Sequence, residues 1–166
     1  MGRRHESLIP LSHEHHDALL LAWRIRTGDL SKREPELRAQ HVSAFFEYRL
    51  IKHLKLEEEL LFPALRAVLG VEASLIDVLL SDHHELRAKA AAIKAGVNDQ
   101  VDSFCGLLEQ HIRTEERQLF VLAENRMAPD EMVELGRQIR ARLSEGRSNC
   151  EIHGNRLEAE DGFAQS

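Results

Sequence analysis

The segment HLKLEEELLF, residues 53–62, has a close copy in HIRTEERQLF, residues 111–120. Both copies place a glutamate four residues after a histidine, and both end on Leu-Phe. Upstream of each copy lies a second matching pair, EHHD at residues 14–17 and DHHE at residues 82–85. A unit made of acid-His-His-acid and then His-x-x-x-Glu-Glu therefore occurs twice. Two such copies predict a twofold-related arrangement in which both sets of side chains meet at one centre.

Composition and chain breaks predict that these segments are helical. Ala, Leu, Glu, Arg and Lys make up about half of the chain, whereas 9 Gly and 4 Pro are too few for a turn-rich β fold. Helix starts are expected at Ser12, Pro35, Glu72, Asn98 or Asp99, and Pro129; ends are expected at Gly28, Gly70, Gly96, Arg126 and Gly146. Pro63 is expected to kink or stop the second helix.

The short loops between these helices predict antiparallel neighbours. The expected fold is all-α, an up-down-up-down four-helix bundle with a short fifth helix, in one domain over residues 1–146. An irregular helical domain is the competing interpretation. Residues 147–166 are polar with little apolar content, so we expect a flexible tail that includes Cys150.

The histidines and glutamates of the repeat continue the apolar stripes of their helices, since residues three or four apart share a helix face. The stripes are Val42, Phe46, Leu50, His53 and Glu57 in one copy and Val101, Phe104, Leu108, His111 and Glu115 in the other. In the third helix, His83 shares its stripe with Leu79 and Leu86, whereas His84 is rotated by about 100°. In the first helix His13, His15 and His16 compete, and His15 is favoured because it lies about 180° from Arg24.

Two core-facing glutamates need a partner, because an unpaired buried carboxylate is too costly to persist. The stripes carry no Lys or Arg, so a metal cation is the expected partner. A single His-x-x-x-Glu pair is usually a solvated contact, but the duplicated set on one seam predicts a metal site. Imidazole and carboxylate donors without thiolate suit iron, manganese or zinc. Two carboxylates able to bridge indicate two metal ions.

Charge, hydropathy and cysteine content bear on the binding partners and on the cellular compartment. A net charge of −6 and a pI near 5.9 argue against a nucleic-acid surface. No apolar run is long enough for a membrane span, and the N-terminus has neither a signal peptide nor a myristoylation pattern. Cys105 is expected in the core and Cys150 as a free thiol, which favours a reducing compartment, the cytoplasm by default. Trp23 is expected in the core. Tyr48 is expected as a packing or surface residue, and a redox or hydrogen-bonding role for it is the alternative.

The pattern of His15, His53, Glu57, His83, His111 and Glu115 resembles the hemerythrin-like, or HHE cation-binding, domain family. The resemblance covers about residues 8–126. It implies a four-helix bundle with a non-haem di-iron centre held by these six side chains. The oxygen-carrying hemerythrins have a second histidine one turn later in the third helix, where this chain has Arg87. This departure argues against simple reversible oxygen carriage. The rival ferritin-like bundles use Glu-x-x-His, which these segments do not follow.

From these features we expect a di-iron protein that binds oxygen, nitric oxide or peroxide at an open iron position, in sensing, storage or stress response. The alternatives are a peroxidase- or catalase-like redox enzyme, an iron-handling or repair protein, and a metal that only holds the bundle together. A partner protein or a second copy of the chain is the expected route for any signal.

Overall fold

The computed structural model describes residues 4–154, and the side chains of residues 4–145. The helices are α1 (Ile9–Arg26), α2 (Pro35–Phe45), η1 (Phe46–Leu50), α3 (Ile51–Leu56), η2 (Glu57–Leu61), α4 (Phe62–Leu69), η3 (Gly70–Ala73), α5 (Ser74–Lys94), α6 (Gln100–Thr114), η4 (Glu115–Leu119), α7 (Phe120–Arg126) and α8 (Pro129–Gly154). No strand occurs in that range, and none of its helices is long and apolar enough to cross a membrane.

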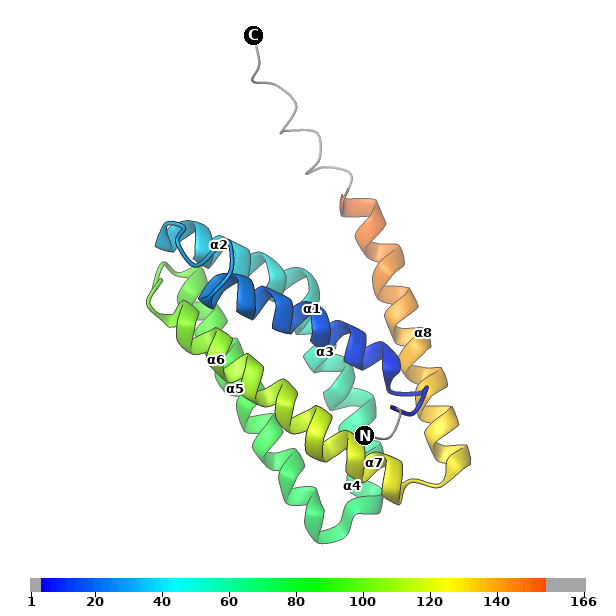
Figure 1. Ribbon diagram of the computed structural model, residues 1–166. Coiled ribbons are helices and arrows are strands. Elements are labelled where there is room, and N and C mark those ends of the chain that lie inside the picture. The colour runs from blue at the N-terminus through cyan, green and yellow to red at the C-terminus, as the bar shows by residue number, and fades with distance from the viewer. Residues whose placement is uncertain (1–3, 155–166) are drawn as a thin grey trace.

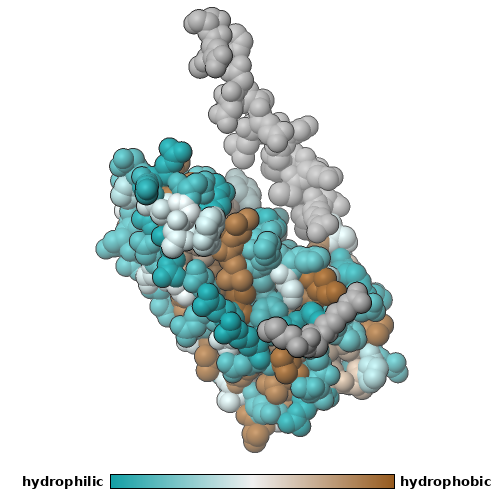
Figure 2. Space-filling view, in the orientation of Figure 1, coloured by the Kyte–Doolittle hydropathy of each residue, from teal (hydrophilic) through white to brown (hydrophobic). Residues whose placement is uncertain are grey.

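Four long helical rods form the bundle that the sequence predicts (Figure 1). Two of the rods are composite, because η1 and η2 join α2, α3 and α4 without a break, and η4 joins α6 to α7. Helix α1 packs on α6, α6 packs on α5, and α5 packs on α2. The predicted all-α bundle is therefore confirmed. On the face seen in Figure 2, hydrophilic side chains cover most of the surface.

Two expectations about helix boundaries differ from the structure. Helix α1 begins at Ile9, so Ser12 is not its cap; the Ser12 hydroxyl instead donates to Glu116 Oε1 at 2.7 Å. Pro63 does not stop its rod. It lies in the first turn of α4, directly after the wide turn of η2 in which the Phe62 N–H donates to the Glu57 carbonyl. Pro63 has no N–H to donate, and the hydrogen bond that the rod loses lies next to the wide turn, where the α-helical pattern already changes.

The fifth helix is longer than expected. Helix α8 continues to Gly154, beyond the end predicted near Gly146. Residues 155–166 of the expected tail, and the side chain of Cys150, lie outside the described part of the chain. The predicted glycine end of α5 is confirmed: Gly96 has φ of 96° and its N–H donates to the Ile93 carbonyl at 2.9 Å.

The expectation for Trp23 is wrong, and the expectation for Tyr48 holds. Trp23 is 55 % exposed because the buried stripe of α1 passes through Ala22 and Ile25, which turns the neighbouring indole outward. Tyr48 is 53 % exposed. Cys105 is buried as predicted.

The core consists of two apolar clusters with a polar layer between them. Along α1, Leu11 belongs to one cluster and Ala18 to the other, and His15 falls between them. Helix α5 repeats this order with Leu79, His83 and Leu86. The two composite rods do the same: Leu50 and Leu61 flank His53 and Glu57, and Leu108 and Leu119 flank His111 and Glu115. The predicted ligands thus share one level of the bundle.

Helix α8 closes one end of the bundle. Its residues Met132, Leu135 and Ile139 are buried in the same cluster as Leu8 and Leu11. Close approach is possible because residue 136 is glycine: an added Cβ would lie 2.4 Å from Ser7 Oγ and 2.8 Å from Ser7 Cα. The N-terminal segment is therefore held between α8 and the bundle.

Gly136→Ala is expected to lower the free energy of unfolding by about 1–3 kcal/mol, because the new methyl group collides with backbone as well as side-chain atoms of Ser7. Gly106→Ala in α6 is the matched control, since no atom apart from its chain neighbours and the backbone of its own helix lies within 4 Å of the position that its new methyl group would take. Loss of helical glycine entropy should make this control more stable by roughly 0.5–1 kcal/mol. Chemical denaturation measures both; equal effects would contradict the packing of α8 on Ser7.

Candidate metal centre

All six predicted ligands lie in the polar layer, on different turns of the four rods. They are His15 on α1, His53 on α3, Glu57 on η2, His83 on α5, His111 on α6 and Glu115 on η4. Every one is buried; His53 is the most exposed at 6 % and both glutamates are at 0 %. His13, His16 and His84 are exposed. The structure thus turns the first histidine of each doublet inward and the second outward.

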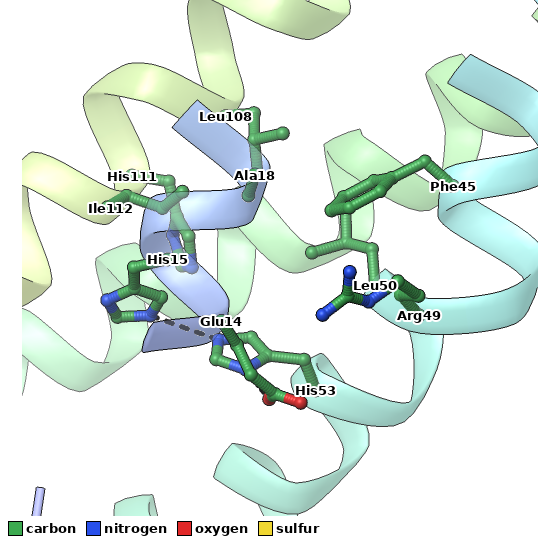
Figure 3. A pocket seen from close by; sticks show the side chains of 10 residues that line it. All are labelled: Glu14, His15, Ala18, Phe45, Arg49, Leu50, His53, Leu108, His111 and Ile112. Carbon is green, nitrogen blue, oxygen red and sulfur yellow. Dashed lines mark hydrogen bonds and ion pairs between the residues drawn. The ribbon is translucent and has the colours of Figure 1, made fainter. Parts of the chain in front are cut away.

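The six side chains form two overlapping groups. One group joins His15 and His53 to Glu57 and Glu115, and the other joins His83 and His111 to the same two glutamates. Within each group the donor atoms lie within 4.8 Å of one another. The Nε2 atoms of His15 and His53 are 3.0 Å apart (Figure 3), and those of His83 and His111 are 3.2 Å apart. Each histidine pair therefore aims two nitrogens at one point.

The glutamate oxygens lack ordinary partners. Among the described side chains, the buried polar atoms without a hydrogen bond are Arg38 Nε and all four carboxylate oxygens of Glu57 and Glu115. Imidazole Nε2 atoms do approach them: His53 lies 3.0 Å from Glu57 and His15 lies 3.2 Å from Glu115. These contacts lack the geometry of hydrogen bonds. Buried unsatisfied carboxylates facing imidazole nitrogens are the donor set that a divalent or trivalent cation requires.

The other ring nitrogen of each histidine contacts a carboxylate. The Nδ1 atoms lie 2.8 Å from Glu116 for His15, 2.7 Å from Glu14 for His53, 2.7 Å from Glu58 for His83 and 3.4 Å from Asp82 for His111. An Nδ1–H donated to a carboxylate leaves Nε2 free as a lone-pair donor and makes the imidazole more basic. All four histidines are therefore oriented for metal binding at Nε2.

These four acids connect the rods in a closed circuit. Glu14 of α1 reaches His53 on α3, and Glu58 of η2 reaches His83 on α5. Asp82 of α5 then reaches His111 on α6, and Glu116 of η4 returns to His15 on α1. Helix periodicity alone assigns these acids no role. The available signal was their place in the repeat, where each stands directly beside a predicted ligand.

Two arginines pair with the outer acids rather than with the buried ones. Arg87 Nη1 donates to Glu58 Oε1 at 2.8 Å, and Arg4 Nη2 donates to Glu116 Oε2 at 2.8 Å. Arg4 also lies over the ring of Phe120, which stacks on His15 with centroids 5.5 Å apart. Arg87, at the position of the missing fifth histidine, therefore supports His83 through Glu58 instead of supplying a ligand.

Wide π-helical turns begin at both buried glutamates. Segments η2 and η4 start at Glu57 and Glu115, and in each the first residue after the segment donates its N–H to the carbonyl of that glutamate. π-helical turns inside α-helices are rare and occur mostly at functional sites. The glutamates share this backbone feature, which their spacing in the sequence does not reveal.

The charges of the layer balance through protons in the metal-free protein. Burial alone lowers the pKa of His53, but Glu57 and Glu14 outweigh it and raise this pKa to about 9. Burial likewise opposes, without preventing, a raised pKa for His15 and His111 beside Glu115. The same contacts hold the pKa of Glu57 well below its usual range, although burial acts to raise it. Protons and a metal cation therefore compete for the same Nε2 atoms.

The family model of the hemerythrin HHE cation binding domain matches residues 6–123. That span contains all six buried side chains and the four outer acids, and it ends before α8. No curated protein and no solved structure matches the chain significantly.

His83→Ala is expected to lose most of its bound metal, because it removes a fully buried Nε2 donor from one of the two groups. The adjacent His84→Ala is the matched control and should keep its metal, since His84 is exposed. Elemental analysis of both purified variants, with circular dichroism to check folding, tests this. Metal loss in His84→Ala alone would contradict the assigned orientation of α5.

The metal-free protein is expected to lose stability as the pH rises from about 6.5 to about 9. The folded-state pKa of His53 is raised from 6.5 to about 9, so its contribution is complete below pH 6.5 and disappears through pH 9. The loss should be on the order of 1 kcal/mol or more. Thermal unfolding across this range measures it. The metal-loaded protein should not show this loss, and a metal-free protein that becomes more stable with rising pH would contradict the assignment.

Proposed function

Because the chain belongs to the hemerythrin HHE cation-binding family, we propose that it is a non-haem di-iron protein that binds oxygen, nitric oxide or peroxide at an open iron position. A role in sensing, storage or stress response follows from such binding. The observation that carries this proposal is the pair of buried, unsatisfied carboxylates shared by two histidine pairs.

Two ions are proposed because the donors divide into two groups around shared glutamates. His15 and His53 would hold one ion, and His83 and His111 would hold the other. Glu57 and Glu115 belong to both groups, so each carboxylate can offer one oxygen to each ion. Nitrogen and oxygen donors without thiolate suit iron, and manganese or zinc would meet the same donors.

An open position is expected from the number of donors. Each group supplies two imidazole nitrogens and two shared carboxylates, which is fewer than the six ligands of an octahedral ion. When bound, iron supplies the position at which a small ligand can coordinate. The chain itself contributes the fixed orientation of the imidazoles, through the carboxylates on their Nδ1 atoms.

A small cavity lies beside His15 and His53, and His111 of the other donor group also lines it (Figure 3). Apolar side chains form much of its wall, namely Ala18, Phe45, Leu50, Leu108 and Ile112. Its volume of about 10 Å³ matches the space that one water molecule needs. Such a space favours a diatomic molecule or peroxide over an organic substrate.

A peroxidase- or catalase-like enzyme is the second candidate. Glu14 lines the same cavity as His15 and His53. A carboxylate can accept a proton from a small ligand there. Glu14 would then be placed to assist turnover of a peroxide.

The protein produced with added iron and purified without air is expected to contain close to two irons per chain, one for each donor group. Nitric oxide added to the reduced protein should change its visible absorption at once, because a coordination position is open. Elemental analysis and anaerobic spectroscopy measure these results, with Glu57→Ala as the metal-depleted control.

Each other outcome has a defined meaning. A single zinc with no uptake of iron would contradict the di-iron proposal. An unchanged spectrum with two irons bound would show a closed, structural centre. Repeated consumption of peroxide, abolished by Glu57→Ala, would favour the enzyme.

A further inference from the structure

The cavity beside His53 meets a much larger groove on the surface. This open groove, about 980 Å³ in volume, lies between α1, the η1–α3 segment and α8. Three residues line both the groove and the cavity: Glu14, Arg49 and His53. Glu14 and His53 are tied to each other by a 2.7 Å contact between Oε2 and Nδ1. Arg49 is the third residue at the boundary between groove and cavity, and its side chain is the long, flexible one that is not part of this contact.

Arg49 is held across this boundary by two weak contacts. Its Nη2 donates to Asp17 Oδ2 at 2.6 Å, which links η1 to α1. Its guanidinium carbon lies 5.9 Å from the centre of the Phe45 ring, which lines the cavity. In Figure 3 the guanidinium stands between Phe45 and the Glu14–His53 pair. The side chain thus extends over the cavity rather than into solvent alone.

We propose that Arg49 is the gate between the groove and the ligand cavity, latched by Asp17. This inference rests on the proposed function, since it assigns a route to the same centre. The ion pair is exposed, at 52 % for Arg49 and 42 % for Asp17. Exposed ion pairs contribute little to stability because water screens them and both side chains lose freedom. The latch therefore opens readily, and it limits the rate of ligand passage without sealing the centre.

The two halves of the repeat differ at the residues that make this opening. The alignment of EHHD with DHHE pairs Ala18 with Leu86, and the alignment of residues 53–62 with 111–120 pairs Arg49 with Leu107. Leu86 is fully buried, and Leu107 packs against the same apolar cluster. Large apolar side chains thus occupy the places that a small residue and a charged residue take in the first half. An arginine at this position therefore occurs only in the first of the two repeated halves.

Binding kinetics test the gate. Nitric oxide would be mixed with the reduced, iron-loaded wild type, Arg49→Ala and Asp17→Asn, and both rates and the equilibrium constant would be measured. Association and dissociation should both become faster, at least about twofold in Asp17→Asn and more in Arg49→Ala. The dissociation constant should stay the same, because a gate changes the path and not the bound state. Iron content and melting temperature should also stay unchanged.

Two further variants separate the gate from other effects. Lys52→Ala is the matched control, because Lys52 lines the groove but not the cavity, and its rates should equal those of the wild type. Ala18→Val narrows the cavity itself and should weaken binding at equilibrium, unlike the gate variants.

The outcomes distinguish the gate from the proposed function. Unchanged rates in Arg49→Ala and Asp17→Asn, with nitric oxide still bound, would overturn the gate and leave the function standing. A changed dissociation constant or spectrum in Arg49→Ala would also overturn it, because Arg49 would then touch the bound ligand. Binding in the gate variants but not in the wild type would support a gate that is closed more tightly. No binding in any iron-loaded variant would overturn both proposals.

Discussion

Two fully buried carboxylates, those of Glu57 and Glu115, impose the constraint on which the rest of this structure depends. They lie between two apolar clusters and have no hydrogen-bond partner among the described residues. No described Lys or Arg forms an ion pair with them, so the four histidines and a cation are the available sources of positive charge. Isolated negative charges in such a place would be strongly destabilising. The bundle is therefore organised around a charge balance that it must satisfy with protons or with metal.

The outer acids show how the bundle keeps that centre in shape. Each one crosses from its own rod to a histidine on the next, and together they close a circuit through all four rods. The link orients an imidazole and at the same time fixes the spacing of two helices. Arg4 and Arg87 neutralise two of these acids at the edge of the layer. The negative charges of the outer acids thus lie between the buried glutamates and the surface.

The duplication is faithful in the ligands and not in their surroundings. The donor atoms and the acids that support them repeat in both halves. Their surroundings do not repeat, because Ala18 aligns with Leu86 and Arg49 aligns with Leu107. A symmetric pair of ions would consequently experience an asymmetric environment, because a small cavity is lined by both histidines of one group and by His111 alone of the other. Chemical difference between the two ions would arise from packing, because the donor sets are alike.

The sequence by itself determined the helical rods, the repeat and the six buried side chains, because helix periodicity places a polar residue on an apolar stripe without reference to the other helices. It also separated His83 from His84 by rotation alone. Two predictions from local sequence were wrong because contacts between helices decide them. Ser12 does not cap a helix, and its hydroxyl donates to Glu116 instead. Trp23 is exposed, because the buried stripe of α1 passes through other residues. Only the tertiary structure decided the circuit of outer acids, the π-helical turns and the cavity beneath Arg49. These features depend on which side chain of one rod meets which position of the next, and that register is set by packing between helices that are distant in the chain.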